Sequence, residues 1–215
     1  MANASGAFGL RPIAKMGSNS NSTGSSGYTK YEIANGNTNV IYQGSPVIPL
    51  STGFIDIVGA AAGGTVGLVG VFYGCEYVSS VTGELTFSNY WPGSGADSNH
   101  PVKAIVYDDP MQLYVISSDA SLTSKATLRG HVFANANFSS GTSGSTTTTG
   151  MSTSAIGVST INTTANLNLR IMGWQEDPEN ADFTAAGIPV IVRLNNHFNS
   201  PNGAIAGGTV STTGV

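Results

Sequence analysis

Charged side chains are scarce in this sequence. Lys, Arg, Asp and Glu make up 9% of its 215 residues, against roughly 25% in an ordinary soluble domain. The eight basic residues are scattered along a chain of net charge −4. Nucleic-acid binding that rests on phosphate neutralisation needs clustered Lys and Arg, so the sequence argues against it. A surface with so few charges is expected to be covered in part by partner chains, and the composition therefore favours assembly.

Cysteine and long apolar runs are scarce as well. The one cysteine, Cys75, excludes an internal disulfide. The longest weakly polar stretch, residues 55–73, is interrupted by glycines, Asp56 and Thr65, so we expect strands there and no membrane span. The first ten residues have neither a positive start nor a sustained apolar segment, and they do not predict a secretory signal. We therefore expect a chain that is made in the cytoplasm.

Short runs rich in Val, Ile, Tyr, Phe and Thr recur from residue 28 onward, between clusters of Gly, Asn, Ser and Pro. This pattern is typical of a sandwich or barrel. Within 167–172, apolar and polar side chains alternate, as in a strand with one buried face. We predict an all-β fold, an antiparallel β-sandwich or barrel-like domain over residues 28–198. The predicted strands are Tyr28–Ala34, Val40–Tyr42, Pro46–Leu50, Phe54–Val58, Thr65–Phe72, Glu76–Val78, Glu84–Ser88, Val102–Tyr107, Gln112–Ser117, Gly130–Ala134, Leu167–Met172 and Val190–Leu194.

Two segments, 17–27 and 139–153, are Gly/Ser/Thr-rich and contain almost no bulky apolar side chain. The first separates the N-terminus from the domain, so we predict an extended N-terminal arm and tether over residues 1–27. Its apolar side chains have little reason to be there unless they dock on a partner; a frayed terminus is the alternative. A flexible tail is predicted over residues 199–215, with the same alternatives. The predicted partner-binding residues are Phe8, Leu10, Pro12 and Ile13.

Paired carboxylates stand out at Asp108-Asp109 and at Glu176-Asp177. Such pairs are able to hold Ca²⁺ or to do acid–base work. Each pair precedes a proline beside a predicted strand, and an Asp-Pro turn accounts for it without further chemistry. We expect turns here, with a single incidental cation as the alternative.

Other patterns that carry chemistry are missing. His100, His131 and His197 lack zinc-ligand spacing, and no G-x-S-x-G nucleophile elbow occurs. The glycine-rich residues 59–64 are not followed by the Lys and Ser/Thr of a phosphate loop. Cys75 lies in an apolar stretch without an adjacent base, which favours a buried thiol over a reactive one. We predict no catalytic, cofactor or metal site, and no enzymatic activity.

Aromatic residues gather over 72–91. Phe72, Tyr73, Tyr77, Phe87 and Trp91 are among them. One interpretation is a platform on which sugars stack. The other is packing in the core or in an interface, which aromatic side chains dominate.

Several blocks occur in a recognisable order along nearly the whole chain. They are ANASGAFGLRPIAKMG, GVFYGCEYVSS with GELTFSNYWPG, VKAIVYDDPMQLYVI, and STINTTANLNLRIMGWQEDPENAD with IPVIVRLNNH. In this series the chain resembles small virion proteins of tailed bacteriophages, the capsid decoration or cement proteins.

The resemblance implies a β-sandwich or barrel-like domain, often a homotrimer, on local or quasi three-fold positions of an icosahedral head. The implied partner is the major capsid protein, and the implied location is the outer surface of the capsid, after synthesis in the bacterial cytoplasm. No active site, nucleic-acid partner or membrane partner comes with it. Two alternatives share the β-rich composition: another phage structural component of the neck, tail or fibre, and a carbohydrate-binding adhesin module displayed on the virion.

Overall fold

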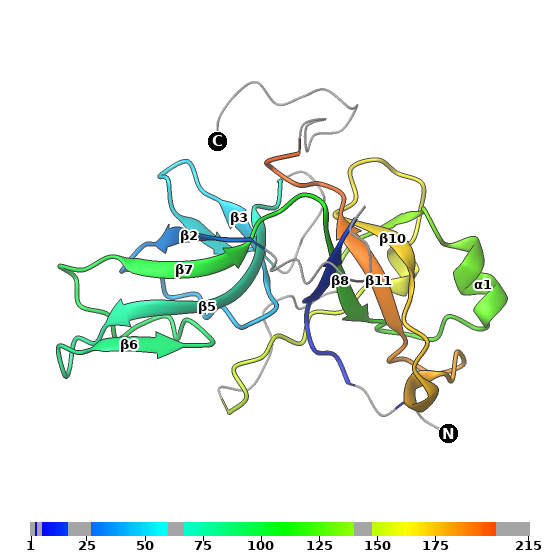
Figure 1. Cartoon of the computed structure of the whole chain (residues 1–215), viewed down its shortest axis with the longest axis horizontal. Helices are drawn as coiled ribbons and strands as arrows, with labels where there is room; N and C mark the ends of the chain where they lie inside the picture. The colour runs from blue at the N-terminus through cyan, green and yellow to red at the C-terminus, as the bar shows by residue number, and fades with distance from the viewer. Residues whose placement is uncertain (1–2, 4–5, 17–26, 60–66, 140–147, 201–215) are drawn as a thin grey trace.

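The computed structural model describes residues 3, 6–16, 27–59, 67–139 and 148–200. Strands dominate, and they form two antiparallel sheets (Figure 1). The predicted all-β fold is confirmed, and the two sheets are consistent with a sandwich. The elements are β1 (Arg11–Lys15), β2 (Tyr28–Ile33), β3 (Pro46–Pro49), β4 (Ile55–Ile57), β5 (Gly70–Val78), β6 (Leu85–Ser88), β7 (Val102–Tyr107), β8 (Gln112–Ser117), α1 (Lys125–Gly130), β9 (Asn135–Ala136), β10 (Leu169–Trp174) and β11 (Pro189–Leu194), with short 3₁₀ helices η1 (Val158–Thr160) and η2 (Pro178–Asn180).

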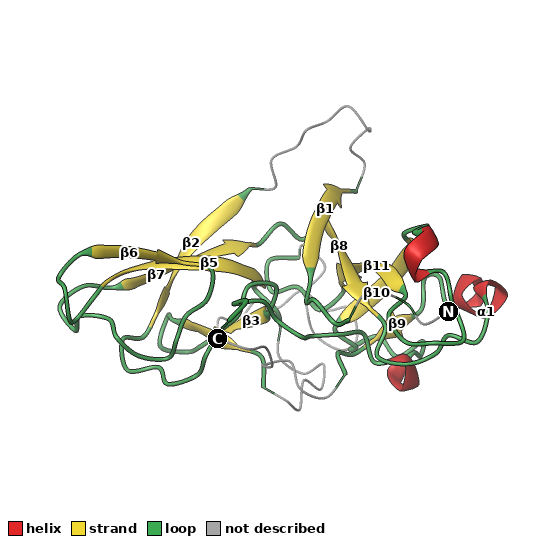
Figure 2. Ribbon diagram, turned by 90° about the horizontal axis from the view of Figure 1, so that it is seen from below, coloured by secondary structure: helices red, strands yellow, loops and turns green. Residues whose placement is uncertain are grey.

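Sheet I has the strand order β1-β8-β11-β10-β9, and sheet II has the order β2-β7-β5-β3-β4, with β6 pairing β5. Figures 1 and 2 both place sheet II at the left and sheet I at the right. The chain crosses from one sheet to the other in the turn 108–111, between β7 and β8.

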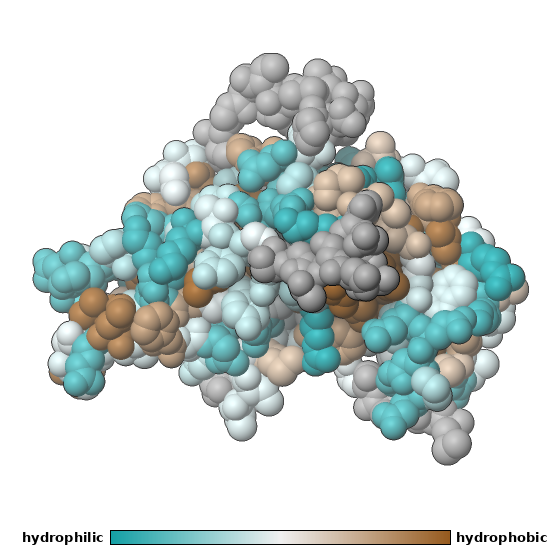
Figure 3. Space-filling view, viewed as in Figure 1, coloured by the Kyte–Doolittle hydropathy of each residue, from teal (hydrophilic) through white to brown (hydrophobic). Residues whose placement is uncertain are grey.

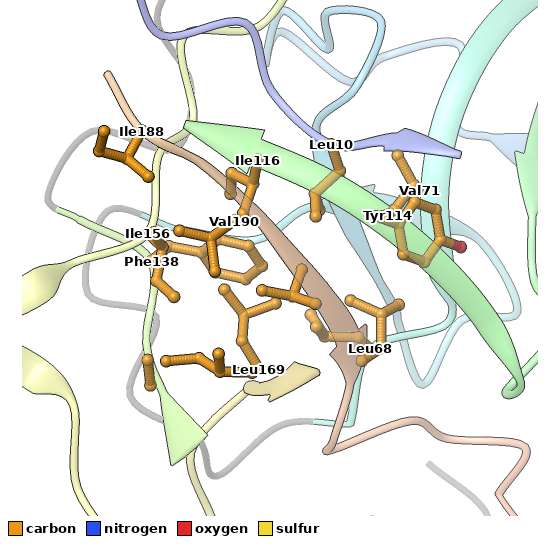
Figure 4. Packing of buried hydrophobic residues seen from close by; sticks show 14 of the residues in the cluster. Leu10, Leu68, Val71, Tyr114, Ile116, Phe138, Ile156, Leu169, Ile188 and Val190 are labelled. Atoms are coloured by element: carbon orange, nitrogen blue, oxygen red, sulfur yellow. The ribbon is translucent and has the colours of Figure 1, made fainter. Parts of the chain in front are cut away.

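Each sheet packs one face on a hydrophobic cluster. The sheet II cluster includes Ile33, Phe72, Trp91 and Val106, all fully buried. The sheet I cluster, shown in Figure 4, joins Tyr114 and Ile116 of β8 with Val190 and Val192 of β11 and also takes up Leu68 and Val71 from the start of the β5 region. Because segments of sheet II contribute to the sheet I cluster, the two halves share one continuous packing junction.

The N-terminal segment differs from the predicted free arm. Residues 11–15 form β1, which pairs with β8 at the edge of sheet I through a bulge between Pro12 and Ala14. Leu10 points into the sheet I cluster and is 1% exposed (Figure 4). An edge strand tolerates Pro12, because the missing N–H need not enter a ladder. The predicted extended arm is therefore not confirmed, since residues 11–15 belong to a sheet. Residues 17–26 and 201–215 of the predicted tether and tail lie outside the described residues.

Four predicted strands also need correction. Residues 40–42 contribute only an isolated bridge between Ile41 and Trp91. Residues 130–134 are the end of α1 and a turn, and the strand β9 begins at Asn135. Residues 70–72 of one expected strand and 76–78 of the next belong to a single strand, β5, with a bulge at Tyr73, while residues 65–66 lie outside the described residues. The first residue of β5 has to be a glycine, because a Cβ at Gly70 would lie 2.2 Å from the Tyr107 carbonyl oxygen.

Candidate interaction surface

The acidic pairs form structural turns, as expected. Asp109 accepts from the backbone N–H of Met111 at 2.8 Å and pairs with Lys15 of β1 at 2.6 Å. Asp108 accepts from the Tyr31 hydroxyl of β2 at 2.8 Å. Burial pushes the pKa of Asp109 upward, but the Lys15 ammonium and the Met111 N–H outweigh it and hold the pKa below its ordinary value. The turn thus ties an edge strand of each sheet to the junction.

The second pair also has a local partner set. Asp177 precedes η2 and accepts from the Glu179 N–H at 3.0 Å and from the Asn180 side-chain amide at 2.6 Å. Glu176 pairs with Lys125 of α1. Over the described ranges, no group of three or more His, Cys, Asp and Glu side chains is placed to hold a metal ion.

The aromatic residues of 72–91 divide between the core and the surface. Phe72 and Trp91 are fully buried, and the Trp91 indole N–H donates to the Asn37 carbonyl at 3.2 Å. Tyr77 packs edge-to-face on Trp91, with ring centroids 5.5 Å apart. Core packing is therefore the role of this part of the cluster. Trp91 has no exposed ring face on which a sugar is able to stack.

The outward side of sheet II carries the exposed aromatic residues. Tyr28 of β2 lies opposite Tyr107 of β7, and Tyr73, in the β5 bulge, packs edge-to-face on Tyr107 at 5.2 Å. Phe87 of β6 lies opposite Glu76 of β5 and is 69% exposed. Apolar side chains gather at the lower left of Figure 3, over the position of β6 in Figure 1. We define the aromatic face as Tyr28, Tyr73, Leu85, Phe87, Ile105 and Tyr107.

Two ion pairs cross the same face. The Lys30 ammonium of β2 reaches over β7 to Glu76 of β5 at 2.5 Å. Lys103 pairs with Glu32 on the neighbouring strand. The two positive and two negative charges cancel, so the face has no net charge that would attract a strongly charged partner. The aromatic face thus combines exposed aromatic side chains with two ion pairs whose charges cancel, and aromatic residues are enriched at protein interfaces.

A groove continues from the aromatic face toward the N-terminal segment. One hollow of about 260 Å³ lies between Tyr73 and Phe87. The next, of about 290 Å³, shares Tyr73 with the first and is lined on its other wall by Phe8 and Arg11. The Arg11 guanidinium stacks over the Phe8 ring at 4.2 Å. Because Tyr73 lines both hollows, they lie next to each other between sheet II and the start of β1.

The four predicted partner-binding residues do not act alike in this geometry. Phe8, Leu10 and Pro12 line the groove, but Leu10 is buried in the core. Ile13 lies on the edge strand β1, 49% exposed. The sequence pattern did not single out Tyr28, Leu85 and Tyr107 as residues of a shared surface. Alternation along β7 marks two faces, yet it does not tell which face another element covers.

Comparison of the chain with protein-family models, curated proteins and solved structures gives no match. No helix in the described part of the chain is long and apolar enough to cross a membrane.

Proposed function

We propose that this chain is a virion structural protein that binds the outside of a tailed-phage capsid and stabilises contacts between capsomers, as a decoration or cement protein. The single observation that carries the proposal is the aromatic face. Exposed aromatic and aliphatic side chains that gather on one face of a protein often mark an interaction site. The resemblance of the ordered sequence blocks to phage decoration proteins favours the same assignment.

The partner that we propose is the major capsid protein, and the assembled form is a homotrimer. Three-fold symmetry lets one small chain contact several capsomers at once, so many weak contacts add up. The neutral face suits this role because its affinity comes from apolar burial and depends little on salt. Sedimentation of the isolated protein tests the trimer directly: a single-chain mass at micromolar concentration contradicts it.

The test of the function is binding to capsids assembled without this chain. We expect wild-type protein to saturate such capsids at hundreds of copies and to raise the temperature at which they rupture. Saturation at about a dozen copies contradicts the cement role and places the protein at a unique vertex, as a neck, tail or fibre component. Absence of binding to any phage particle overturns the virion assignment.

A matched pair of phenylalanines tests the surface. Phe87 on the aromatic face and Phe133 outside it are 69% and 73% exposed. Burying a Phe side chain contributes about 1.5–3 kcal/mol, so Phe87→Ser is expected to weaken capsid binding at least about tenfold. Phe133→Ser is expected to bind as wild type. Equal behaviour of the two variants contradicts the aromatic face as the contact, while leaving capsid binding itself intact.

A further inference from the structure

A separate hollow of about 340 Å³ lies beside sheet I. It is formed where the start of α1, the end of β10 and the segment around η2 meet, and Figures 1 and 2 show these elements on the same side of the molecule, away from sheet II. The volume falls within the range of roughly 300–1,000 Å³ that is usual for small-molecule sites. None of its lining residues belongs to the aromatic face.

One wall of the hollow is apolar. It is made by Trp174, the last residue of β10, together with Phe183 and Ile188. Trp174 and Phe183 are half-buried, so part of each ring is open to a ligand, whereas Ile188 is buried. Flat aromatic surfaces of this type bind apolar faces of ligands while the indole keeps a polar edge.

Polar side chains lie over the Trp174 ring and beside it. The Lys125 ammonium lies 5.6 Å from the centroid of the Trp174 ring and donates to Glu176 at 2.5 Å. This pair sets a cationic donor and an anionic acceptor side by side at the rim. Asn180, which also lines the hollow, is 5% exposed and donates to Asp177.

We propose that this hollow binds a neutral saccharide. A sugar ring has an apolar C–H face, which matches the Trp174 wall, and hydroxyl groups that both donate and accept, which match the adjacent Lys125 and Glu176. An anionic ligand would be repelled by the carboxylates of Glu176 and Asp177, and an organic cation would be repelled by the Lys125 ammonium, so a neutral ligand is favoured. The site goes beyond the proposed assembly role and gives a capsid-bound protein a second contact, to polysaccharide.

The experiment is calorimetric titration of the full-length protein with glucose, galactose, mannose, N-acetylglucosamine, lactose and cellobiose. Wild-type protein is expected to bind at least one of them saturably. Trp174→Ala is expected to abolish that binding, and Glu176→Gln to weaken it about tenfold, because one charge-assisted hydrogen bond is lost. The control is Trp91→Phe, which alters the other tryptophan, buried in the core.

Two further arms keep the proposal open to refutation. If Trp174→Ala unfolds, Lys125→Met and Glu176→Gln remain informative, because both side chains are exposed and folding does not depend on them. Binding of choline or acetate with none of the sugars overturns the saccharide assignment, and so does sugar binding that survives Trp174→Ala. Capsid binding by Trp174→Ala is expected to equal that of wild type, so failure of this site is distinguishable from failure of the proposed function.

Discussion

Leu10 and Gly44 join the N-terminal segment to the junction between the sheets: the Leu10 backbone N–H donates to the Gly44 carbonyl oxygen at 2.9 Å. The preceding residue, Gly9, donates in the same way to Ser154 at 3.1 Å. With the Leu10 side chain in the sheet I cluster, residues 9–15 are part of the fold and not an appendage. If this segment contacts a partner, its residues do so from a position that the fold holds fixed.

The first prediction concerns this anchoring. Leu10→Ala removes a fully buried side chain and is expected to lower the free energy of unfolding by about 2–4 kcal/mol. Ile13→Ala, three residues further on and 49% exposed, is expected to change it by less than about 0.5 kcal/mol. Urea denaturation followed by tryptophan fluorescence measures both. Equal effects of the two substitutions contradict the packing of Leu10.

The same arrangement limits what a truncation is able to show. Deleting residues 1–16 removes β1 and Leu10 together, so a loss of capsid binding would not separate docking from folding. Phe8→Ser keeps the strand and alters one wall of the groove. We expect Phe8→Ser to weaken capsid binding while leaving the urea midpoint close to that of wild type. A shifted midpoint means that Phe8 is part of the fold.

Local sequence patterns were sufficient for much of the fold. The bounds of β7 and β8 are those expected from their apolar runs, because the strand signal is contained in six consecutive residues. The strand β1 was missed, since RPIAK lacks alternation and becomes a strand only by pairing with β8, about a hundred residues away in sequence. The aromatic face was missed for a similar reason: exposure of Tyr28 and Tyr107 depends on what the rest of the chain leaves uncovered.

The second prediction concerns the close approach of β5 to β7. A Cβ at Gly70 would lie 2.2 Å from the Tyr107 carbonyl oxygen and 2.8 Å from a Val106 methyl group. Gly70→Ala must therefore displace backbone, and we expect a loss of about 1–3 kcal/mol of stability. Gly36→Ala is the control, because its Cβ meets nothing within 4 Å. Thermal unfolding followed by circular dichroism compares the stability of the two variants. If Gly70→Ala is as stable as wild type, β5 and β7 do not lie this close together.

The third prediction concerns the single thiol. Cys75 is buried, and its Sγ contacts the Tyr90 carbonyl oxygen at 3.5 Å. Burial, with a smaller contribution from the Glu76 charge, raises the pKa of Cys75 to about 12. The thiol is thus protonated and inaccessible at pH 8. We expect iodoacetamide to modify Cys75 only as fast as the protein unfolds, with a rate that rises with urea; rapid labelling of folded protein contradicts the burial.

The fourth prediction rests on the surroundings of His197, at the end of the described chain. Its side chain is fully buried, and its Nδ1 accepts from the Asn199 N–H at 3.1 Å. Burial lowers the pKa of His197 to about 4, although the charges of Asp108 and Asp109 act in the opposite direction, and the Arg193 charge adds to the lowering. The folded protein therefore holds this imidazole neutral.

Stability is consequently expected to fall as the pH is lowered from 6.5 to about 4. Above pH 6.5 the ring is neutral in both states and the full stability is present. Between the ordinary pKa of 6.5 and the folded value of about 4, only the unfolded chain binds the proton, which costs up to about 3 kcal/mol at the lower end. Urea midpoints measured across this range test the effect. His197→Gln is expected to flatten the dependence, because it removes the buried imidazole, whereas His100→Gln, at an exposed position, should leave the wild-type slope. A slope that survives His197→Gln assigns the pH dependence to other groups.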